Sequence, residues 1–492
     1  MSATEKGGKK RGLTRRQFIA GATAAAGSLA ISGCDEATQK IISSGGALPD
    51  PGTSGIDHIV VVMMENRSFD HFLGWVPGAD GIQAGVSQLD LDGNAVQSYD
   101  LAPEFQNCAL ADPDHTYPGG RTQINGGKMD GFLLTQPTGD RFPVGYYTAD
   151  SLPFYKGCAE NWTICDHYFS GMLGLTTPNR IYMHAGQTDR LVNSVDISTL
   201  PTVWDRMLEK GRSVAYYYTD VSYISYWGSK YSSFSKKYDM SSFATSVAGG
   251  DLPDLMFVDN VGNLLNEGGA ISIDDHPYAD IRNGQAFLNH VYNTLRAHPQ
   301  WDKTLLIINY DEWGGFYDHV PPPLAPVSPE EAALGNDGSL GCRVPCVLIG
   351  PRVRRGHVEK TQFDPNSILN MIAWRFGFEP LGARASSNNL ALALDFSSPP
   401  DATTPAFEVA QGPFGQTCIP TAGIGDLVGV PLPGLPVQPI PRLPIQFLPI
   451  PGLDVPFPSL LPSAGVASAE QRRASHEDEL EALRQLGRRY GF

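Results

Sequence analysis

Two pairs of oxygen-bearing side chains follow long apolar runs in this sequence, and their chemistry suggests a metal site. The residues are Glu65 and Asn66 after the run 58–64, and Asp311 and Glu312 at the end of the run 304–311. Strand ends far apart in sequence can converge above a parallel sheet, so we expect these four side chains to lie together. Carboxylates brought together raise one another's pKa unless a cation or protons offset their charge.

The ligand types narrow the identity of the expected ion. Oxygen ligands suit hard divalent cations and argue against zinc or copper. We therefore expect one divalent metal ion, which can be Ca, Mn, Mg or Fe. Helix caps and surface salt bridges are the alternative, and they would account for either pair alone. The presence of two such pairs at strand ends favours the metal.

A threonine pair provides a candidate nucleophile. In the stretch "TTPNR" (176–180) we expect Pro178 to be the first helical residue, with Thr176 or Thr177 as the cap. A hydroxyl there lies near unpaired N–H groups and the positive end of the helix dipole, which favours a phosphate. A metal contact would lower the pKa of the hydroxyl and give an alkoxide near neutral pH. An ordinary helix start is the alternative.

Three histidines stand beside acids in predicted loops. They are His115 in "DPDHTY", His276 in "DDHP" and His319 in "DEWGGFYDHVPPP". Histidines in such places suit proton transfer to a leaving group or contact with a phosphate. Each of them, taken singly, could equally form a surface salt bridge.

The elements that must position these residues alternate along the chain. Near-continuous apolar runs predict strands buried on both faces, at 58–64, 213–219, 254–259, 304–311 and 344–350. Helices are expected between them, for example at 279–298 and 366–377. The alternation predicts an α/β fold with a mainly parallel central sheet flanked by helices, whose ligands bind beyond the carboxyl ends of the strands.

The N-terminus has the features of an export signal. "TRRQFIA" (14–20) matches the twin-arginine pattern, and an uncharged apolar run leads to "ISGC", a lipobox-like end at Cys34. We expect export by the twin-arginine translocon and membrane anchorage through lipidated Cys34, facing the periplasm or the cell exterior. Cleavage near the small residues, with Cys34 incidental, is the alternative. The net charge of −16 argues against a nucleic-acid partner.

We expect five segments along the chain. These are a signal peptide (1–33), a flexible tether (34–54), a catalytic domain (55–413), a proline-rich tail (414–466) and a short amphipathic helix (467–492). Six further cysteines permit up to three disulfides in an oxidising compartment, and their pairing stays open. They are Cys108, Cys158, Cys165, Cys342, Cys346 and Cys418.

Four motifs together resemble a known family. They are "ENRSFDHFLG", "TTPNR", "DDHP" and "DEWGGFYDHVPPP", in this order within residues 56–390. The set is similar to the bacterial phosphoesterases, which comprise phospholipase C-type enzymes and related acid phosphatases of the alkaline phosphatase superfamily. One departure is "DPNS" (364–367), where Pro365 replaces a histidine of the family's D-H-T-S stretch.

The resemblance implies a role for each candidate residue. It implies a metal held by Glu65, Asn66, Asp311, Glu312 and Thr176, with Thr176 also the nucleophile. The phosphate would lie among His115, His276 and His319, with Arg180 bracing the nucleophile turn and Asp318 orienting His319. The implied reaction is a double displacement through a phosphothreonine, in which His319 or His276 protonates the leaving alcohol.

Three other functions compete with this interpretation. A sulfatase needs a cysteine or serine at the nucleophile position, and threonine cannot give the formylglycine. An acid phosphatase acting on monoesters is barely separable by sequence from a phospholipase acting on phospholipid diesters, so it stays the alternative. A non-catalytic surface lipoprotein should have lost its ligands, whereas all four expected ligands and the threonine are present.

Overall fold

The computed structural model describes residues 48–260, 272–416, 418 and 469–492. The predicted signal peptide, the lipobox Cys34, most of the tether and the proline-rich residues 419–468 lie outside the described residues, and expectations about them stay predictions. Residues Pro49–Phe492 form one compact unit. This unit begins before the predicted boundary at residue 55, because Ser54 is buried and its carbonyl oxygen accepts a hydrogen bond from Arg352 Nε at 3.0 Å.

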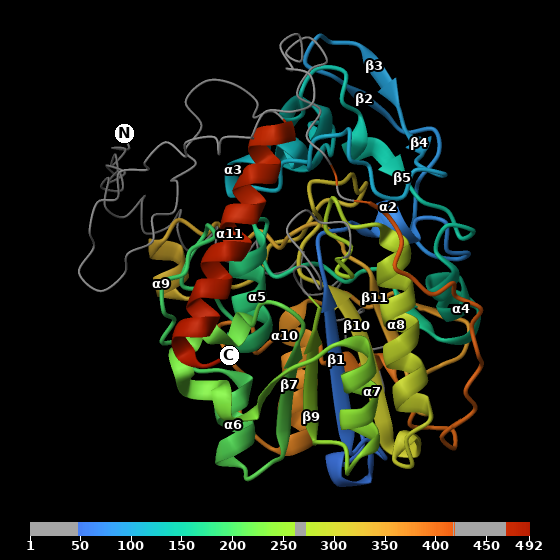
Figure 1. Cartoon of the computed structure of the whole chain (residues 1–492), viewed down its shortest axis with the longest axis vertical. Helices are drawn as coiled ribbons and strands as arrows, with labels where there is room; N and C mark the ends of the chain where they lie inside the picture. The colour runs from blue at the N-terminus through green and yellow to red at the C-terminus, as the bar shows by residue number, and fades with distance from the viewer. Residues whose placement is uncertain (1–47, 261–271, 417, 419–468) are drawn as a thin grey trace, which may run out of the picture. The chain divides into compact units, whose positions relative to one another are not determined.

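The core of the described chain is a sheet of eight strands in the order β12-β6-β11-β10-β1-β9-β7-β8 (Figure 1). Their bounds are β1 His58–Met64, β6 Thr163–Cys165, β7 Val214–Tyr218, β8 Ser235–Lys237, β9 Leu255–Asp259, β10 Thr304–Tyr310, β11 Cys346–Ile349 and β12 His357–Glu359. All neighbours pair in parallel except β11, which is antiparallel to both β10 and β6. The predicted mainly parallel sheet is therefore confirmed.

The five strands expected from the sequence are β11, β10, β1, β9 and β7, which are consecutive in the sheet. Every residue of β1 and of β10 is buried, as the unbroken apolar runs required. The three strands that were not expected, β6, β8 and β12, have three residues each, too few to show a periodicity.

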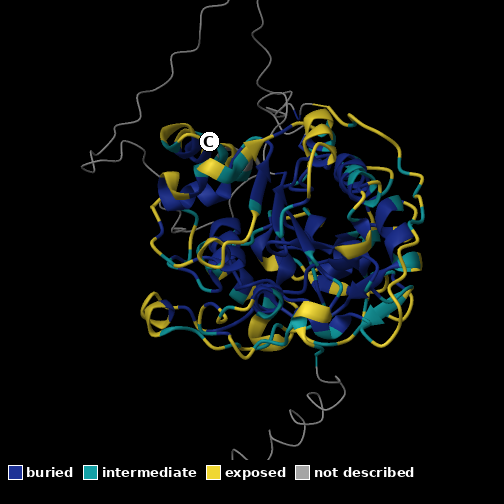
Figure 2. Cartoon of the chain, turned by 90° about the horizontal axis from the view of Figure 1, so that it is seen from below, coloured by how far each residue is buried: buried dark blue, intermediate teal, exposed yellow. Residues whose placement is uncertain are grey.

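Helices cover the sheet. Helices α4 (Pro153–Asn161), α7 (Met240–Ala248) and α8 (Ile281–Arg296) pack together as one group. Helices α5 (Thr176–Ala185), α6 (Val203–Glu209) and α10 (Pro365–Phe376) form another. In Figure 1 α7 and α8 lie in front of the strands. Figure 2 shows the strands as buried, with exposed residues mainly in the surrounding loops and outer helices.

The remaining elements lie around the sheet. The further helices are α2 Phe69–Leu73, α3 Tyr117–Ile124, α9 Pro329–Ala333 and α11 Ala469–Tyr490. The short 3₁₀ helices are η1 Pro51–Thr53, η2 Asn125–Gly127, η3 Phe132–Thr135, η4 Phe142–Val144, η5 Tyr223–Phe234, η6 Trp301–Lys303 and η7 Leu390–Ala393. Two small sheets pair β2 (Ser87–Leu89) with β3 (Ala95–Gln97) and β4 (Tyr99–Asp100) with β5 (Gly145–Tyr146). None of the helices in the described part of the chain has the length and apolar character needed to cross a membrane.

The cysteines form one disulfide within the described residues. Cys108 bonds Cys418, which ties the last described residue before the proline-rich segment to the body. The other four, Cys158, Cys165, Cys342 and Cys346, are buried free thiols. Of the three disulfides that the sequence permitted, the described chain contains this one.

The "DPNS" stretch has a structural role in this chain. Asp364 caps α10, its side chain accepting the Ser367 N–H at 3.0 Å while Ser367 Oγ accepts the Asp364 N–H at 3.0 Å. Pro365 occupies the first helical position. A residue there forms no intrahelical hydrogen bond through its N–H, so proline, which has no N–H, is tolerated. The residues that replace the family's D-H-T-S stretch thus build a helix start.

This cap gives a stability prediction. Asp364→Ala removes the acceptor for the Ser367 N–H and should lower the free energy of unfolding by about 1 kcal/mol. Asp364→Asn keeps a side-chain acceptor of the same shape and should retain most of that stability. Urea unfolding followed by far-UV circular dichroism measures both variants. Equal stability of the Ala and Asn variants would show that the cap contributes nothing.

Candidate active site

The acid pairs leave the same edge of the sheet. Strands β1 and β10 are parallel neighbours with Met64 opposite Tyr310, so the residues after them start side by side. Glu65, Asn66, Asp311 and Glu312 are each at most 1% exposed. The Asn66 N–H donates to Asp311 Oδ1 at 3.1 Å, which joins the two strand ends directly. The structure thus places the four predicted ligands side by side at one edge of the sheet.

Arg180 holds the carboxylates of three strands. From α5 its fully buried guanidinium reaches Glu65 Oε1 at 2.9 Å, Asp311 Oδ2 at 3.1 Å and Asp259 Oδ1 at 2.9 Å. It also donates to the carbonyl oxygens of Met63 and Met64. We expected Arg180 to brace the nucleophile turn. Its bonds instead join the carboxyl ends of β1, β9 and β10, because a guanidinium can satisfy several acceptors at once.

Negative charge exceeds positive charge in this cluster. Burial raises the pKa of Glu65 well above its usual range, and the Asp311 carboxylate raises it further. Burial likewise raises the pKa of Asp311, and it raises that of Glu312 to about 8. A single guanidinium therefore does not offset these acids, and the site calls for protons or a further cation.

Several oxygens in the cluster have the character of metal ligands. Asn66 Oδ1 and Glu312 Oε1 are buried, and neither has a hydrogen-bond partner among the described residues. Asn66 adopts φ +57°, a left-handed conformation that costs energy for a residue other than glycine. Gly314 closes over it, and a Cβ there would lie 2.6 Å from Asn66 Oδ1. Unbonded amide and carboxylate oxygens held in this way fit a hard divalent cation.

Thr176 lies at the edge of this cluster. Helix α5 begins at Thr176, and Thr176 Oγ1 is 3.4 Å from Glu65 Oε2, to which it donates. The expected cap was wrong: Leu175 is the N-cap, and Pro178 is the third helical residue. The first four N–H groups of a helix lack intrahelical partners, so proline is tolerated there as well as at the first position.

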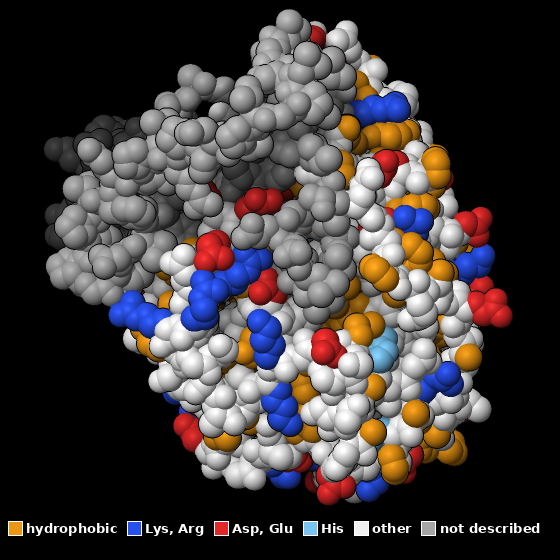
Figure 3. Space-filling view, in the orientation of Figure 1, with side chains coloured by type: hydrophobic (Ala, Val, Ile, Leu, Met, Phe, Trp, Pro, Cys, Tyr) orange, Lys and Arg blue, Asp and Glu red, His pale blue; other side chains and the backbone are white. Residues whose placement is uncertain are grey.

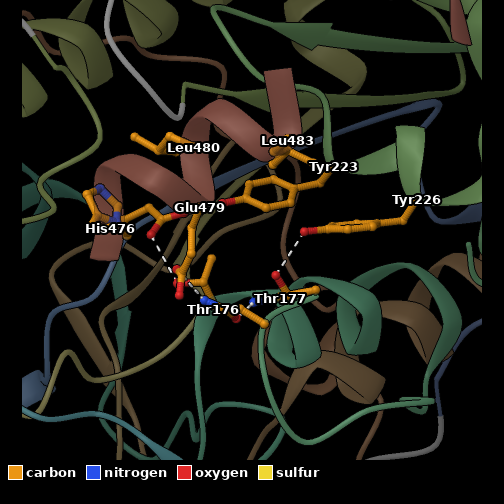
Figure 4. Close-up of a pocket in the computed structure, with 10 residues that line it drawn as sticks. Thr176, Thr177, Tyr223, Tyr226, His476, Glu479, Leu480 and Leu483 are labelled. Carbon is orange, nitrogen blue, oxygen red and sulfur yellow. Dashed lines mark hydrogen bonds between the residues drawn. The ribbon is translucent and has the colours of Figure 1, made fainter. Parts of the chain in front are cut away.

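Thr177 has a different environment. Its hydroxyl pairs with Tyr226 OH at 2.9 Å, and its N–H donates to Asn193 Oδ1 at 2.9 Å. Figure 4 shows Thr176 and Thr177 at the start of α5, facing Tyr223 and Tyr226. Of the two threonines, Thr176 is therefore the one that contacts the acid cluster.

His115 and His276 form a second group of side chains, which lies next to Glu312. His115 Nε2 is 3.8 Å from Glu312 Oε1, and its Nδ1 bonds the Pro113 carbonyl at 2.8 Å. Burial lowers the pKa of His115, but Glu312 and Asp112 outweigh it and raise the pKa to about 9. The His276 ring is 6.1 Å from that of His115, and burial lowers its pKa well below the usual range.

His319 and Asp318 belong to a separate ionic cluster. Asp70 Oδ2 accepts from His319 Nδ1 at 2.6 Å, and His319 Nε2 is 3.1 Å from Asp80 Oδ1. Asp318 instead accepts two bonds from the buried Arg343, at 2.9 and 3.1 Å. The expectation that Asp318 orients His319 was wrong, since the residue bonded to the ring is Asp70. None of the contacts recorded for His319 in the described chain reaches Thr176 or Glu65.

Several site residues escaped the sequence analysis. Asp259 ends β9 just as the other acids end their strands, so the predicted strand 254–259 carried a signal for it. Asp112 forms a group with His115 and His276 whose potential ligand atoms lie within 4.8 Å of one another. Asn193, His476 and Glu479 carried no such signal. His476, Glu479, Leu480 and Leu483 of α11 line the cavity beside Thr176 (Figure 4).

The chain is similar to several known proteins. Residues 56–379 match the model of the Phosphoesterase family. Non-specific phospholipase C3 of Arabidopsis thaliana is 30% identical over 65% of this chain and 67% of its own length. Phospholipase C B of Mycobacterium tuberculosis is 29% identical over 86% of this chain and 94% of its own length. A solved structure from the alkaline phosphatase superfamily, from Vibrio parahaemolyticus, covers 70% of this chain and 72% of that one at 10% identity, with a TM-score of 0.37.

The acid cluster gives a prediction for metal binding. A divalent cation at 100 times its Kd should raise the free energy of unfolding by about 2.7 kcal/mol, measured separately with Ca²⁺, Mn²⁺, Mg²⁺ and Fe²⁺. Glu312→Gln should lose much of this gain because it removes a charged oxygen. Asn66→Gly should also lose it, since glycine accepts the left-handed backbone but carries no amide.

Asp302→Asn is a control, because it neutralises an exposed acid outside the cluster. Thermal unfolding of the purified chain, with and without each ion, gives the readout independently of any reaction. A cation effect of the same size in all four proteins would place the ion elsewhere.

Proposed function

This chain belongs to the Phosphoesterase family, and on that premise we propose that it is a metal-dependent enzyme of phospholipase C type. It hydrolyses a phosphodiester bond of a phospholipid, with Thr176 as the nucleophile. The observation that carries the proposal is the position of the Thr176 hydroxyl, 3.4 Å from Glu65 and at the start of a buried helix. A helix start suits a phosphate ester, and a divalent cation held by the acid cluster would offset the negative charge of both the acids and the phosphate.

The proposed metal site consists of Glu65, Asn66, Asp311, Glu312 and Thr176. When bound there, a divalent cation supplies positive charge that lowers the pKa of a neighbouring hydroxyl and offsets charge on a phosphoryl oxygen. Arg180 keeps Glu65 and Asp311 at fixed positions through its ion pairs. Asn66 is held in a left-handed conformation, and its Oδ1 has no hydrogen-bond partner among the described residues, so it is free to bind such an ion.

The chain's own residues then move the protons. Thr176 donates its hydroxyl hydrogen to Glu65 Oε2 and forms a bond to phosphorus, while the bond to the lipid alcohol breaks. His115 is proposed as the proton donor to that alcohol, because its Nδ1 bonds a carbonyl and its Nε2 faces Glu312. Water then loses a proton to His115 and forms a bond to phosphorus, while the Thr176–phosphorus bond breaks and Thr176 takes its hydrogen back from Glu65.

His115 takes the place of the donors expected from the sequence, His319 and His276. His319 is bonded to Asp70 and Asp80 in its own ionic cluster. His276 donates its Nδ1–H to the Pro277 carbonyl, and burial lowers its pKa, so the neutral ring has no proton on Nε2 to give to the leaving alcohol, and we propose that it lines the place of the phosphoryl group instead. This assignment supports a role for the Asp112–His115–His276 group in holding the substrate.

The nucleophile assignment predicts a large loss of rate. Thr176→Ala should lower kcat by more than about 10³-fold, because no other hydroxyl at the start of α5 contacts Glu65. Thr177→Ala is the matched control, since its hydroxyl bonds Tyr226, and its kcat should stay within about tenfold of the wild type. Initial rates on p-nitrophenyl phosphate and a phospholipid measure both variants. A Thr176→Ala enzyme with normal kcat would remove Thr176 from the reaction.

Substrate class is tested by a comparison of three esters. Phosphatidylcholine, sphingomyelin and p-nitrophenyl phosphate are offered to the wild-type enzyme, with and without a chelator. We expect hydrolysis of the two lipids, and we expect the chelator to stop it. Turnover of the small ester with none of the lipids would instead make the enzyme a phosphomonoesterase, and turnover that survives chelation would contradict the metal.

A further inference from the structure

Helix α11 lies across the candidate active site, although it comes after the body in sequence, beyond residues 419–468 (Figure 1). Leu483 and Leu486 are 3% and 4% exposed, and the helix packs on η5. Arg484 Nε forms an ion pair with Asp220 Oδ2 at 2.7 Å. Arg472 donates to the carbonyl oxygens of Asp112 and Thr135, both at 2.6 Å. The helix therefore spans from the η5 side to the Asp112 side.

The opposite face of α11 is charged. Its exposed residues include Glu477, Asp478, Glu481, Arg488 and Arg489. Figure 3 shows basic and acidic side chains together over the position of α11. An apolar inner face and a charged outer face make the helix amphipathic. If it left the body, only one of its faces would bring apolar side chains into water.

The inner face brings a carboxylate to the nucleophile. Glu479 lines the cavity together with Thr176 and Glu65, and Asn193 Nδ2 donates to Glu479 Oε2 at 2.7 Å. A second hydrogen bond fixes the orientation of the Asn193 amide, because its Oδ1 accepts the Thr177 N–H at 2.9 Å. The Nδ2 group is thereby aimed into the site. A carboxylate resembles a phosphoryl group in offering negatively charged acceptor oxygens to such a donor.

His476 of α11 makes a second contact with the candidate site, to His276. Its ring stacks on His276 with the centroids 3.7 Å apart and the planes inclined by 5°. His276 belongs to the group that is proposed to contact the phosphoryl group. Two residues of α11, one turn apart, thus cover two sides of the place that a substrate would use.

Little space is left for a substrate under the helix. The cavity lined by Thr176, Tyr223, Glu479 and Leu483 has a volume of about 20 Å³. That volume holds about one water molecule, which is less than a phosphate needs. A phosphate ester can therefore reach Thr176 only after Glu479 has moved.

The surface of the body on which α11 packs, called its seat below, is also incompletely filled. A pocket of about 120 Å³ that is partly open to solvent lies beside its C-terminal half, lined by Leu483, Arg488 and residues such as Tyr218 and Lys237. Unfilled space forfeits the dispersion contacts that hold a well-packed helix in place. Arg484 and Glu479 bond to polar groups that can also be satisfied by water once the helix has left.

We propose that α11 is an autoinhibitory lid, in which Glu479 stands in for the phosphoryl group of a substrate, and that Asn193 binds a phosphoryl oxygen when the lid is open. The identity of the bound group as a phosphate ester rests on the proposed function. The chain just before residues 419–468 is fixed to the body by the Cys108–Cys418 disulfide. The helix consequently stays tethered when it opens, and it closes again as an intramolecular partner.

The test uses the full chain with its cation. Leu483→Asp places a charge in the buried seat and should unseat α11, whereas Gln485→Asp places the same residue on the exposed face of the same helix. Isothermal titration with inorganic phosphate and kcat/KM on p-nitrophenyl phosphate are measured for both. We expect Leu483→Asp to bind phosphate at least tenfold more tightly and to gain at least tenfold in kcat/KM. We expect Gln485→Asp to match the wild type.

Glu479→Ala is the second route, should Leu483→Asp fail to fold. It removes the stand-in carboxylate and leaves the apolar seat intact, so phosphate affinity should again rise. In the unseated Leu483→Asp background, Asn193→Asp keeps the acceptor for the Thr177 N–H but replaces the donor by a negative charge. Phosphate affinity should then fall at least tenfold. No fall would overturn the role of Asn193.

The outcomes separate the lid from the proposed function. Unchanged or weaker phosphate binding by Leu483→Asp and Glu479→Ala, or a loss of rate in both, would overturn the lid and make α11 a permanent wall of the site. Tighter phosphate binding without hydrolysis of any ester would support the lid and contradict the proposed enzyme. If the wild type hydrolyses an ester but neither variant gains in phosphate affinity or kcat/KM, the proposed enzyme is supported and the lid is contradicted.

Discussion

The burial of several carboxylates around one guanidinium is the constraint on which the rest of this structure depends. Glu65, Asp259 and Asp311 all bond Arg180, and Glu312 stands beside them with an oxygen that no described residue hydrogen-bonds. Removing like charges from water is costly unless each one is paired and hydrogen-bonded. The sheet order makes the pairing possible, because β10, β1 and β9 are neighbours and their ends lie within reach of one arginine.

The local backbone adapts to that constraint. Asn66 takes a left-handed conformation, and Gly314 takes φ +64°, so that the two loops can close on each other above the strand ends. Helix α5 delivers both Arg180 and, one turn earlier, Thr176. The residue that forms ion pairs with the acids and the residue proposed as the nucleophile are therefore fixed by the same rigid element. A shift of α5 would disturb both the ion pairs and the hydroxyl.

Much of this arrangement could be predicted from the sequence, for an identifiable reason. Strands buried on both faces appear as unbroken apolar runs, and the residues directly after such a run lie at a sheet edge, so the positions of Glu65 and Asp311 could be inferred. The same logic would have found Asp259. The start of α5 was misplaced because the first turn of a helix has several unpaired N–H positions, and the sequence does not say which of them a proline occupies.

Contacts between distant segments could not be predicted. The partner of His319 is Asp70, 249 positions away, and no local pattern distinguishes it from Asp318, the nearer acid. The docking of α11 is of the same kind: leucines at helical spacing predicted an apolar face but not what covers it. Glu479 reaches Asn193 across 286 positions. In the proposed lid, the contact between Glu479 and Asn193 decides whether a substrate can approach Thr176.

The central claim is that Thr176 takes the phosphoryl group before water does. The stereochemical course at phosphorus tests it most directly, with an ester made chiral at phosphorus by oxygen isotopes and sulfur. Two successive in-line displacements, the first by Thr176 and the second by water, predict retention of configuration. Inversion would mean a single displacement by water, and it would contradict the account of this site.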